Sequence, residues 1–206
     1  QFRSDVQSGK LPKVSWLVAP NQFSDHPSAP WYGAWYLAEA MNILTQNPEV
    51  WKKTIFILTY DENDGYFDHV PPFVSPDPRR PETGRVSAGI DARTEYWPLE
   101  KDRKRAGRDD ARGGPIGLGF RVPMVVASPW SRGGYVCSQV FDHTSVLQLL
   151  ERVCKVKEPN ISPWRRAVCG DMSAVFRPFR HDPETKLPYP ARDEFLGGIH
   201  QAQFRP

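Results

Sequence analysis

The stretch Thr54-Ile-Phe-Ile-Leu-Thr-Tyr60 runs directly into Asp61-Glu-Asn-Asp-Gly-Tyr-Phe-Asp-His69, so a cluster of acids follows an apolar segment at once. The apolar segment is short, contains β-branched residues and is bounded by polar ones, which favours a central strand of a parallel sheet over a helix. In open α/β sheets, ligands bind just beyond the carboxyl ends of such strands. The carboxylates of Asp61 and Glu62, with an imidazole nearby, suit a divalent cation.

The acidic loop also has a simpler interpretation. Asp, Asn and Gly are the residues that make up ordinary solvated turns, and this loop contains all three. Its composition therefore leaves both a metal site and a plain turn open.

Size and composition indicate one domain, or most of one. A chain of 206 residues can bury a substantial core. Its 39% hydrophobic and 12% aromatic residues exclude general disorder, while 21 Pro and 15 Gly predict long irregular loops. A formal net charge of +3 is too small to indicate nucleic-acid binding. No run approaches the roughly 20 apolar residues that a membrane-spanning helix needs.

Basic residues gather in three places, at Arg79-Arg80, from Lys101 to Arg108 and at Arg165-Arg166. Most such runs are solvated faces. The alternative is a bound anion, and phosphate is the ligand to test.

The three cysteines, Cys137, Cys154 and Cys169, have the spacing of neither a zinc ribbon nor a redox pair. A disulfide between Cys154 and Cys169 and a set of buried free thiols are both compatible with their positions.

The amino-terminal part of the chain predicts a strand, a loop and a helix. Val14 to Ala19 is a short apolar run before Pro20, and the polar loop that follows carries His26 next to Asp25. An apolar stripe from Trp31 to Asn47 predicts a core-facing helix. Together with Thr54 to Tyr60 this makes a strand-helix-strand unit, which is almost always right-handed and parallel. His26 would then lie at the same sheet edge as the acidic loop, although an isolated loop histidine more often has no function.

The segment from Pro71 to Gly119 has almost no apolar periodicity, and we call it the insertion. A structureless loop of this length is usually functional or disordered. The insertion either forms a wall or a lid of the site or is a plain surface loop. Its isolated aromatic residues are Tyr96 and Trp97.

After the insertion, the pattern predicts one more strand and one more helix. Arg121 to Ser128 is the predicted strand. A helix of about three turns follows Phe141-Asp-His-Thr-Ser145, with Ser145 and Gln148 spaced as a capping box. His143 would stand at the positively polarised end of that helix, either in a structural role or near a docked anion. Residues 177–206 are rich in Pro and weakly patterned, so we expect them to form an irregular tail or a connector to another domain.

Several of these segments occur together, and in this order, in a known family. They are Ser24-Asp-His-Pro27, the stretch from Ile57 to Pro72 with Tyr-Asp-Glu-Asn-Asp-Gly-Tyr-Phe-Asp-His-Val-Pro-Pro, the stretch Gly117-Leu-Gly-Phe-Arg-Val-Pro-Met-Val-Val-Ala-Ser-Pro-Trp-Ser-Arg-Gly-Gly134, Phe141-Asp-His-Thr-Ser145 and Asn160-Ile-Ser-Pro-Trp-Arg-Arg166. The chain resembles the bacterial phosphoesterases that include phosphocholine-preferring phospholipases C and acid phosphatases, within the alkaline phosphatase superfamily.

The resemblance implies an α/β fold with a mostly parallel, alkaline-phosphatase-like sheet flanked by helices. Residues 1–176 would be the carboxyl-side part of the catalytic domain, with the insertion at 71–119. The family's nucleophile and its amino-terminal Glu-Asn metal ligands have no counterpart in this chain, so the remainder of the catalytic domain would complete the site.

By the same resemblance, Asp61 and Glu62 are metal ligands or their neighbours, and the metal is zinc, calcium or manganese. His26, His69 and His143 are the catalytic candidates, and Tyr66 and Arg121 the candidates for substrate contact. The implied reaction is hydrolysis of phosphatidylcholine-like phosphodiesters to diacylglycerol and phosphocholine by a periplasmic or secreted enzyme, with peripheral membrane contact as an option. The aromatic residues of the insertion could then face the quaternary amine of the head group. A phosphomonoesterase and a non-catalytic binding fragment are the alternatives. Asp64 departs from the glycine usual in relatives.

Overall fold

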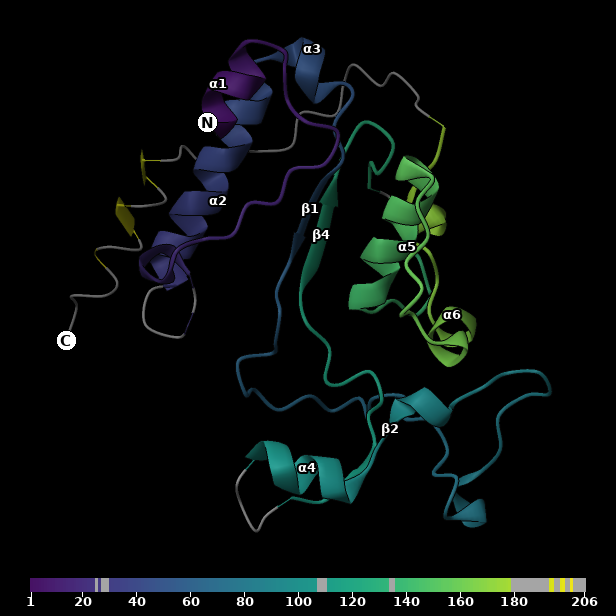
Figure 1. Ribbon diagram of the computed structural model, residues 1–206. Coiled ribbons are helices and arrows are strands. Elements are labelled where there is room, and N and C mark those ends of the chain that lie inside the picture. The colour runs from purple at the N-terminus through teal and green to yellow at the C-terminus, as the bar shows by residue number, and fades with distance from the viewer. Residues whose placement is uncertain are drawn as a thin grey trace. The chain divides into compact units, whose positions relative to one another are not determined.

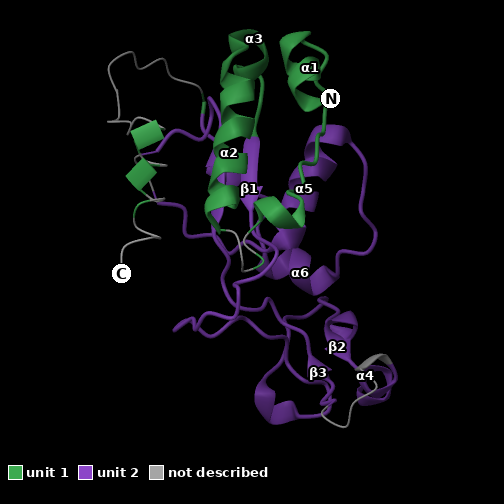
Figure 2. Cartoon of the chain, turned by 90° about the vertical axis from the view of Figure 1, so that its left-hand side faces the viewer, with its two compact units in different colours: residues 1–55, 178–206 green, residues 56–177 purple. Residues whose placement is uncertain are grey.

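The computed structural model describes residues 1–24, 26, 30–106, 111–133, 136–178, 193–194, 197–198 and 201, with residues 105 and 106 by backbone alone. The chain divides into two compact units, residues 1–55 with 178–206 and residues 56–177 (Figure 2). Each unit has buried apolar residues of its own. They are Val6, Ala40, Ile43 and Leu44 in the first unit, and Leu149, Ile161, Trp164, Cys169 and Met172 in the second.

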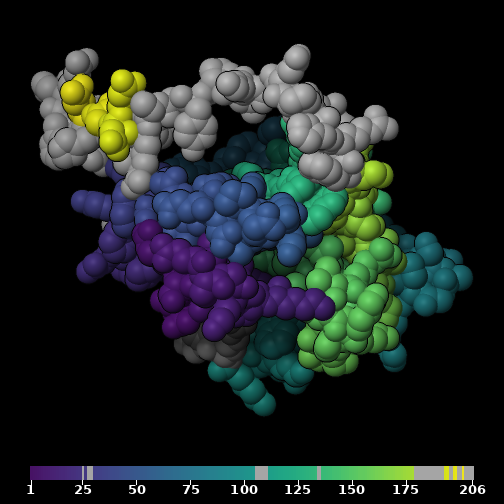
Figure 3. All heavy atoms as spheres, turned by 90° about the horizontal axis from the view of Figure 1, so that it is seen from above, coloured from purple at the N-terminus to yellow at the C-terminus, as the bar shows by residue number. Residues whose placement is uncertain are grey.

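The first unit is helical. Its elements are α1 (Phe2–Gln7), the 3₁₀ turn η1 (Asn21–Phe23), α2 (Pro30–Thr45) and α3 (Pro48–Trp51). α1 packs along α2, as Figure 3 shows from above, and Val6 and Leu44 are almost fully buried. The Asn47 side chain accepts from the backbone N–H groups of Glu49 and Val50, and it donates to the carbonyl of Val6 at 2.7 Å. The predicted helix is confirmed, although Pro48 begins a second short helix after it.

The predicted strand at Val14 to Ala19 is wrong. These residues form no strand, and they are largely exposed, with Trp16 at 66% and Val18 at 83%. A strand is stable only where a neighbour pairs with its backbone and a face is covered. The described residues supply neither for this run.

The second unit contains a two-stranded sheet of β1 (Phe56–Thr59) and β4 (Met124–Ala127). The strands pair antiparallel, with Phe56 opposite Ala127 and Thr59 opposite Met124. Both strands were predicted, but the parallel sheet expected around them is not confirmed, because the described residues contain no parallel pair. The mixture of helices and small antiparallel sheets is consistent with an α/β fold (Figure 1).

The antiparallel direction follows from the insertion. A parallel neighbour needs a crossover that returns the chain to the starting end of the first strand. Here the insertion leaves the carboxyl end of β1 and comes back to that same end, where the N–H of Tyr60 donates to the carbonyl of Pro123. β4 therefore starts where β1 stops.

Two helices, α5 (His143–Cys154) and α6 (Pro163–Val168), and the 3₁₀ turn η4 (Ser173–Val175) complete the second unit. The helix predicted after Phe141 is confirmed, with His143 as its first residue. The predicted capping box is displaced by three residues. Asp142 is the N-cap and Ser145 its reciprocal partner, because the Asp142 carboxylate accepts from the Ser145 N–H while Ser145 Oγ accepts from the Asp142 N–H.

The insertion has regular structure, contrary to expectation. It contains η2 (Pro81–Thr83), η3 (Arg93–Glu95), β2 (Tyr96–Trp97), α4 (Leu99–Ala106) and β3 (Gly114–Pro115). β2 pairs antiparallel with β3, Tyr96 opposite Pro115. These elements are too short to give a recognisable apolar periodicity in the sequence, which explains why no regular structure was predicted for the insertion.

Most of the predicted tail at 177–206 lies outside the described residues, and the boundary at 176 stays a prediction. In the described part of the chain, no helix combines the length and the apolar character needed to cross a membrane.

Gly117 is a position where the insertion requires glycine. Its φ is +69°, and a Cβ atom there would stand 2.8 Å from the carbonyl oxygen of Phe73. We expect Gly117→Ala to lower the free energy of unfolding by about 2–4 kcal/mol, because a steric clash adds to the cost of a left-handed backbone. Gly119→Ala is the matched control, since φ is +76° but no atom lies within 4 Å. It should cost only about 1 kcal/mol. Urea unfolding measures both, and equal losses would contradict the clash.

Candidate functional site

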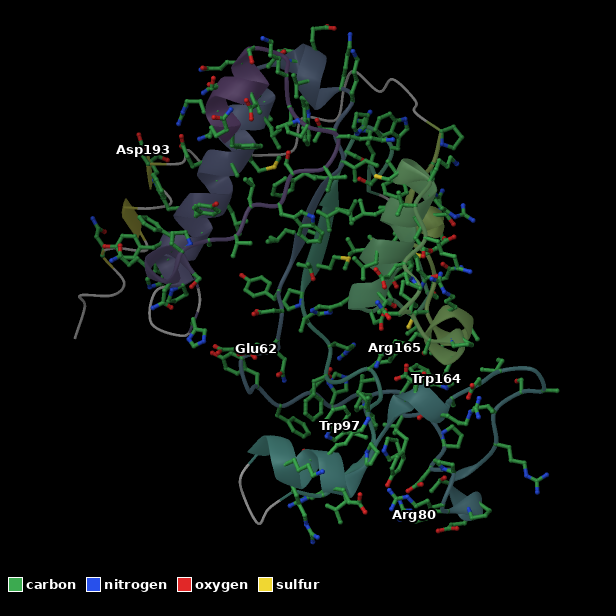
Figure 4. All side chains as sticks on the ribbon, in the orientation of Figure 1. Glu62, Arg80, Trp97, Trp164, Arg165 and Asp193 are labelled. Carbon is green, nitrogen blue, oxygen red and sulfur yellow. The ribbon has the colours of Figure 1, made fainter. Side chains whose placement is uncertain are left out.

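The acidic loop begins two residues after β1. Asp61 and Glu62 are both exposed, and neither makes a hydrogen bond or ion pair with any described residue. Figure 4 shows Glu62 on the loop beyond the sheet. Two adjacent carboxylates with no protein partner in the described chain are available to an outside ligand.

The next four residues form a tight turn. The N–H of Tyr66 donates to the carbonyl of Asn63 at 3.2 Å, and Asn63 Nδ2 donates to the carbonyl of Tyr66 at 2.7 Å. Both central residues are left-handed, Asp64 with φ 56° and Gly65 with φ 73°. This is the primed turn that Asp-Gly favours, because Asp and Gly tolerate the left-handed region. Asp64 therefore keeps the turn that a glycine would make.

Beyond the turn, Asp68 holds Arg121 in a bidentate ion pair. Arg121 Nε donates to Oδ2 at 2.8 Å and Nη2 donates to Oδ1 at 2.7 Å, while the backbone N–H of Arg121 adds a third bond at 3.1 Å. These hydrogen bonds from Arg121 hold the pKa of Asp68 well below its usual range. The pair fastens the acidic loop to the segment that leads into β4.

The remaining candidates are spread over both units. His69 is exposed, and its Nδ1 lies 3.9 Å from Asp68 Oδ1. Tyr66 is 74% exposed. His143 is exposed at the first position of α5, and His26 is exposed in the first unit. Asp25, the neighbour of His26 in the sequence, lies outside the described residues.

The residues present fit part of a metal site. Asp61 and Glu62 offer the oxygen ligands that hard divalent cations prefer. However, the searched part of the structure contains no group of three or more His, Cys, Asp or Glu side chains placed to hold an ion. Within the described residues, the oxygen ligands available are therefore the two carboxylates of Asp61 and Glu62.

A buried ionic network centred on Arg165 joins three segments of the second unit. From α6, Arg165 Nε and Nη2 donate to the two carboxylate oxygens of Glu95, each at 3.0 Å. Its Nη1 donates to Asp142 Oδ2 at 2.6 Å, and Nη2 also reaches the carbonyl of Gly117 at 2.8 Å. Ser162 donates its hydroxyl proton to Glu95. The side chains of Glu95, Asp142 and Arg165 are 4%, 5% and 17% exposed.

Burial opposes the charge on Arg165, but the bonds to Asp142 and Glu95 outweigh it and raise the pKa of this guanidinium. Arg165 is thus committed to the interior and is not available to a bound phosphate. Its neighbour Arg166 forms a bidentate pair with Glu151 on α5, at 2.8 and 2.9 Å. The pair with Glu151 does not by itself exclude an anion at Arg166, so the anion-binding alternative stays a prediction there.

The aromatic residues of the insertion have cations of their own. The Arg79 guanidinium lies 4.3 Å from the centroid of the Tyr96 ring, and the Lys101 ammonium lies 5.7 Å from that of Trp97. A quaternary amine would have to displace these groups from the same faces or use the opposite ones. The basic run that continues to Arg108 lies partly outside the described residues.

The three cysteines are free thiols, so of the two alternatives the disulfide is the one that the structure does not form. Cys169 is 4% exposed, whereas Cys137 and Cys154 are half-buried. Burial, with the negative charge of Asp142, raises the pKa of the Cys169 thiol to about 12. The folded state thus favours the neutral thiol, and this preference is lost as the pH rises from the ordinary thiol pKa toward 12.

We expect Cys169 to react slowest with a thiol-specific disulfide reagent at pH 8, because it is buried and un-ionised. Peptide mapping by mass spectrometry after timed labelling of the native protein gives the order. The urea-unfolded protein is the control, in which all three should react at similar rates. Native labelling of Cys169 as fast as Cys154 would contradict the burial.

Comparison with known proteins assigns the chain to a family. The model of the phosphoesterase family matches residues 1–157, which include the acidic loop, the insertion, β4 and α5. The chain belongs to the phosphoesterase family. This confirms the resemblance drawn from the motifs.

Curated members of the phosphoesterase family resemble the chain over most of its length. A non-hemolytic phospholipase C of Burkholderia pseudomallei is 48% identical, covering 85% of this chain and 24% of the relative. A hemolytic phospholipase C of Pseudomonas aeruginosa is 47% identical, covering 85% of this chain and 22% of the relative. Phospholipase C A of Mycobacterium tuberculosis is 43% identical, covering 91% and 33%. The chain thus spans about a quarter to a third of the length of these relatives.

Sequence reasoning missed the members of the Arg165 network. Asp142 lies inside a recognised motif but was overlooked beside His143. Arg165 was interpreted as one half of a surface basic pair. Glu95 gave no local signal, because nothing near it in the sequence indicates burial.

Proposed function

We propose that the protein containing this chain is a phospholipase C that hydrolyses phosphatidylcholine-like phosphodiesters to diacylglycerol and a phosphorylated head group. The observation that carries the proposal is the 43–48% identity to bacterial phospholipases C over at least 85% of the chain. The free carboxylates of Asp61 and Glu62 support the proposal, because they can bind a divalent metal ion. Such an ion supplies the positive charge that phosphoryl transfer needs beside the phosphate.

In this proposal Asp61 and Glu62 bind a divalent metal, which when present stabilises charge on the phosphoryl oxygens. Zinc, calcium and manganese are the candidates. The remainder of the catalytic domain supplies the hydroxyl nucleophile and the other ligands. It also extends the β1–β4 pair toward the mostly parallel sheet of the alkaline phosphatase superfamily.

The other candidate residues have separate tasks. His69 and His143 exchange protons with the ester or hold its phosphoryl oxygens. His26 is a candidate by its motif alone. Arg121 keeps Nε and Nη2 on Asp68, so its Nη1 is the atom that can donate to a substrate oxygen. Tyr66, exposed at the end of the turn, contacts the head group. The protein acts at a lipid surface outside the cytoplasm.

Assays of the full-length protein with phosphatidylcholine and with p-nitrophenyl phosphate test this function. We expect release of phosphocholine and diacylglycerol, with the diester hydrolysed faster than the monoester. A strong preference for the monoester would establish an acid phosphatase instead. Inactivity on both substrates with zinc, calcium or manganese present would favour the non-catalytic alternative.

A further inference from the structure

The Arg165 network connects parts of the chain that lie far apart in sequence. Arg165 and Glu95 are separated by 70 positions, and Arg165 and Asp142 by 23. Glu95 ends η3 in the insertion, Asp142 caps α5, and Arg165 stands in α6, where α6 meets the insertion (Figure 4). A single guanidinium therefore fixes the insertion and the amino end of α5 to the same helix.

The two oxygens of the Asp142 carboxylate have different partners. Oδ1 accepts from the Ser145 N–H at 3.2 Å and from the Thr144 hydroxyl at 2.6 Å, which caps α5. Oδ2 accepts from Arg165 at 2.6 Å. Because both oxygens are bound, the Asp142 side chain is held in one orientation. This in turn fixes the direction of the backbone from Asp142 into the first residue of α5, His143.

We propose that Arg165 is a positioning residue that acts through His143. The inference rests on the proposed function, in which His143 contacts the phosphate ester. Glu95 and Asp142 hold the guanidinium, and the guanidinium sets the amino end of α5 against the insertion. The nitrogens of the Arg165 guanidinium all donate to Glu95, Asp142 or the carbonyl of Gly117, so its effect on the reaction passes through the exposed imidazole next to Asp142.

The chain offers a matched control in the next residue. Arg166 also lies in α6, and it makes a bidentate pair with Glu151 on α5, two turns beyond His143. Arg165, by contrast, makes its bidentate pair with Glu95 and a single bond to Asp142. The side-chain hydrogen bonds of Arg166 reach Glu151 and the carbonyl of Glu158, and not Asp142 or the insertion. Loss of Arg166 therefore loosens the same two helices without releasing the amino end of α5.

The test measures kcat and KM of the full-length protein on the ester that the wild type hydrolyses. Arg165→Lys keeps the charge but loses the fork that spans Glu95 and Asp142. We expect kcat to fall about 10- to 100-fold, the scale of a small displacement of a catalytic group, with KM changed less than about threefold. Glu95→Gln should lower kcat in the same way and serves if the lysine variant does not fold. Arg166→Met should change kcat less than about threefold.

A double-mutant cycle separates positioning from general stability. In a His143→Ala background, Arg165→Lys should cause no further loss of the residual kcat beyond about twofold, because the group it positions is gone. Equal effects of Arg165→Lys and Arg166→Met, additive losses in the cycle, or full activity of His143→Ala would each overturn the inference and leave the proposed function intact. Inactivity of the wild type on both esters would instead remove the proposed function itself.

Discussion

Asp61→Asn in the full-length protein should lower kcat by about two to three orders of magnitude or more and reduce the bound metal. The change removes one negative charge from the pair of free carboxylates beyond β1 while keeping the size of the side chain. Loss of electrostatic stabilisation of a phosphoryl transition state is worth about 3–4 kcal/mol, which corresponds to a drop on this scale. Steady-state kinetics give kcat, and elemental analysis by plasma mass spectrometry gives the metal content.

Asp64→Asn is the control in the same loop. Asparagine tolerates the left-handed backbone that Asp64 adopts, so the turn is preserved while one charge is lost. We expect its kcat to stay within about threefold of the wild type and its metal content to be unchanged. If Asp61→Asn retained wild-type turnover, Asp61 would have no role as a ligand, and equal losses in the two variants would assign the effect to net charge alone.

Arg165→Met should strongly destabilise the second unit. Methionine leaves Glu95 and Asp142 buried without their cation, and breaking a buried ion pair from one side costs about 3–5 kcal/mol. The opening free energy of α5 and α6 should fall by that amount, so hydrogen exchange at their amides should accelerate by about two to four orders of magnitude. Exchange followed by mass spectrometry on the full-length protein measures the two helices directly.

Arg166→Met provides the comparison for this measurement. The Arg166 and Glu151 side chains are 29% and 17% exposed, so water partly compensates the loss of their pair. We expect a loss of about 1–2 kcal/mol at the same helices. The double variant Arg165→Met, Glu95→Gln should recover part of the stability, because one stranded charge is removed. No recovery would indicate that packing around the guanidinium, and not charge, dominates.

Local patterns in the sequence located the main elements of the fold. The apolar stripe before Pro48, the β-branched run before Tyr60 and the spacing after Phe141 each gave the correct element, because each depends on neighbours within a few residues. The direction of β4 against β1 could not be obtained in this way. It depends on the path of the insertion, whose own short elements have no readable period.

In the candidate site too, local patterns identified some residues, whereas contacts between residues far apart in the sequence were missed. Asp61 and Glu62 were identified because they follow a strand, and the structure leaves both exposed beyond it. The pair between Asp68 and Arg121 joins residues 53 positions apart, and no spacing rule connects them. The same is true of Glu95, whose burial becomes understandable only when Arg165 arrives from α6. Charged residues that look solvated in sequence can thus be the interior of a unit.

The anchoring of Glu95 has a consequence for how the site is reached. An outward swing of the insertion about a hinge would separate Glu95 from Arg165 and Ser162. The motion would pass through an intermediate conformation in which buried charges have no partners, so its energy barrier would be large. The parts of the insertion that carry η2 and α4 lie outside these bonds and can move without breaking them. We therefore expect product departure to be independent of insertion motion, so that solvent viscosity has little effect on kcat.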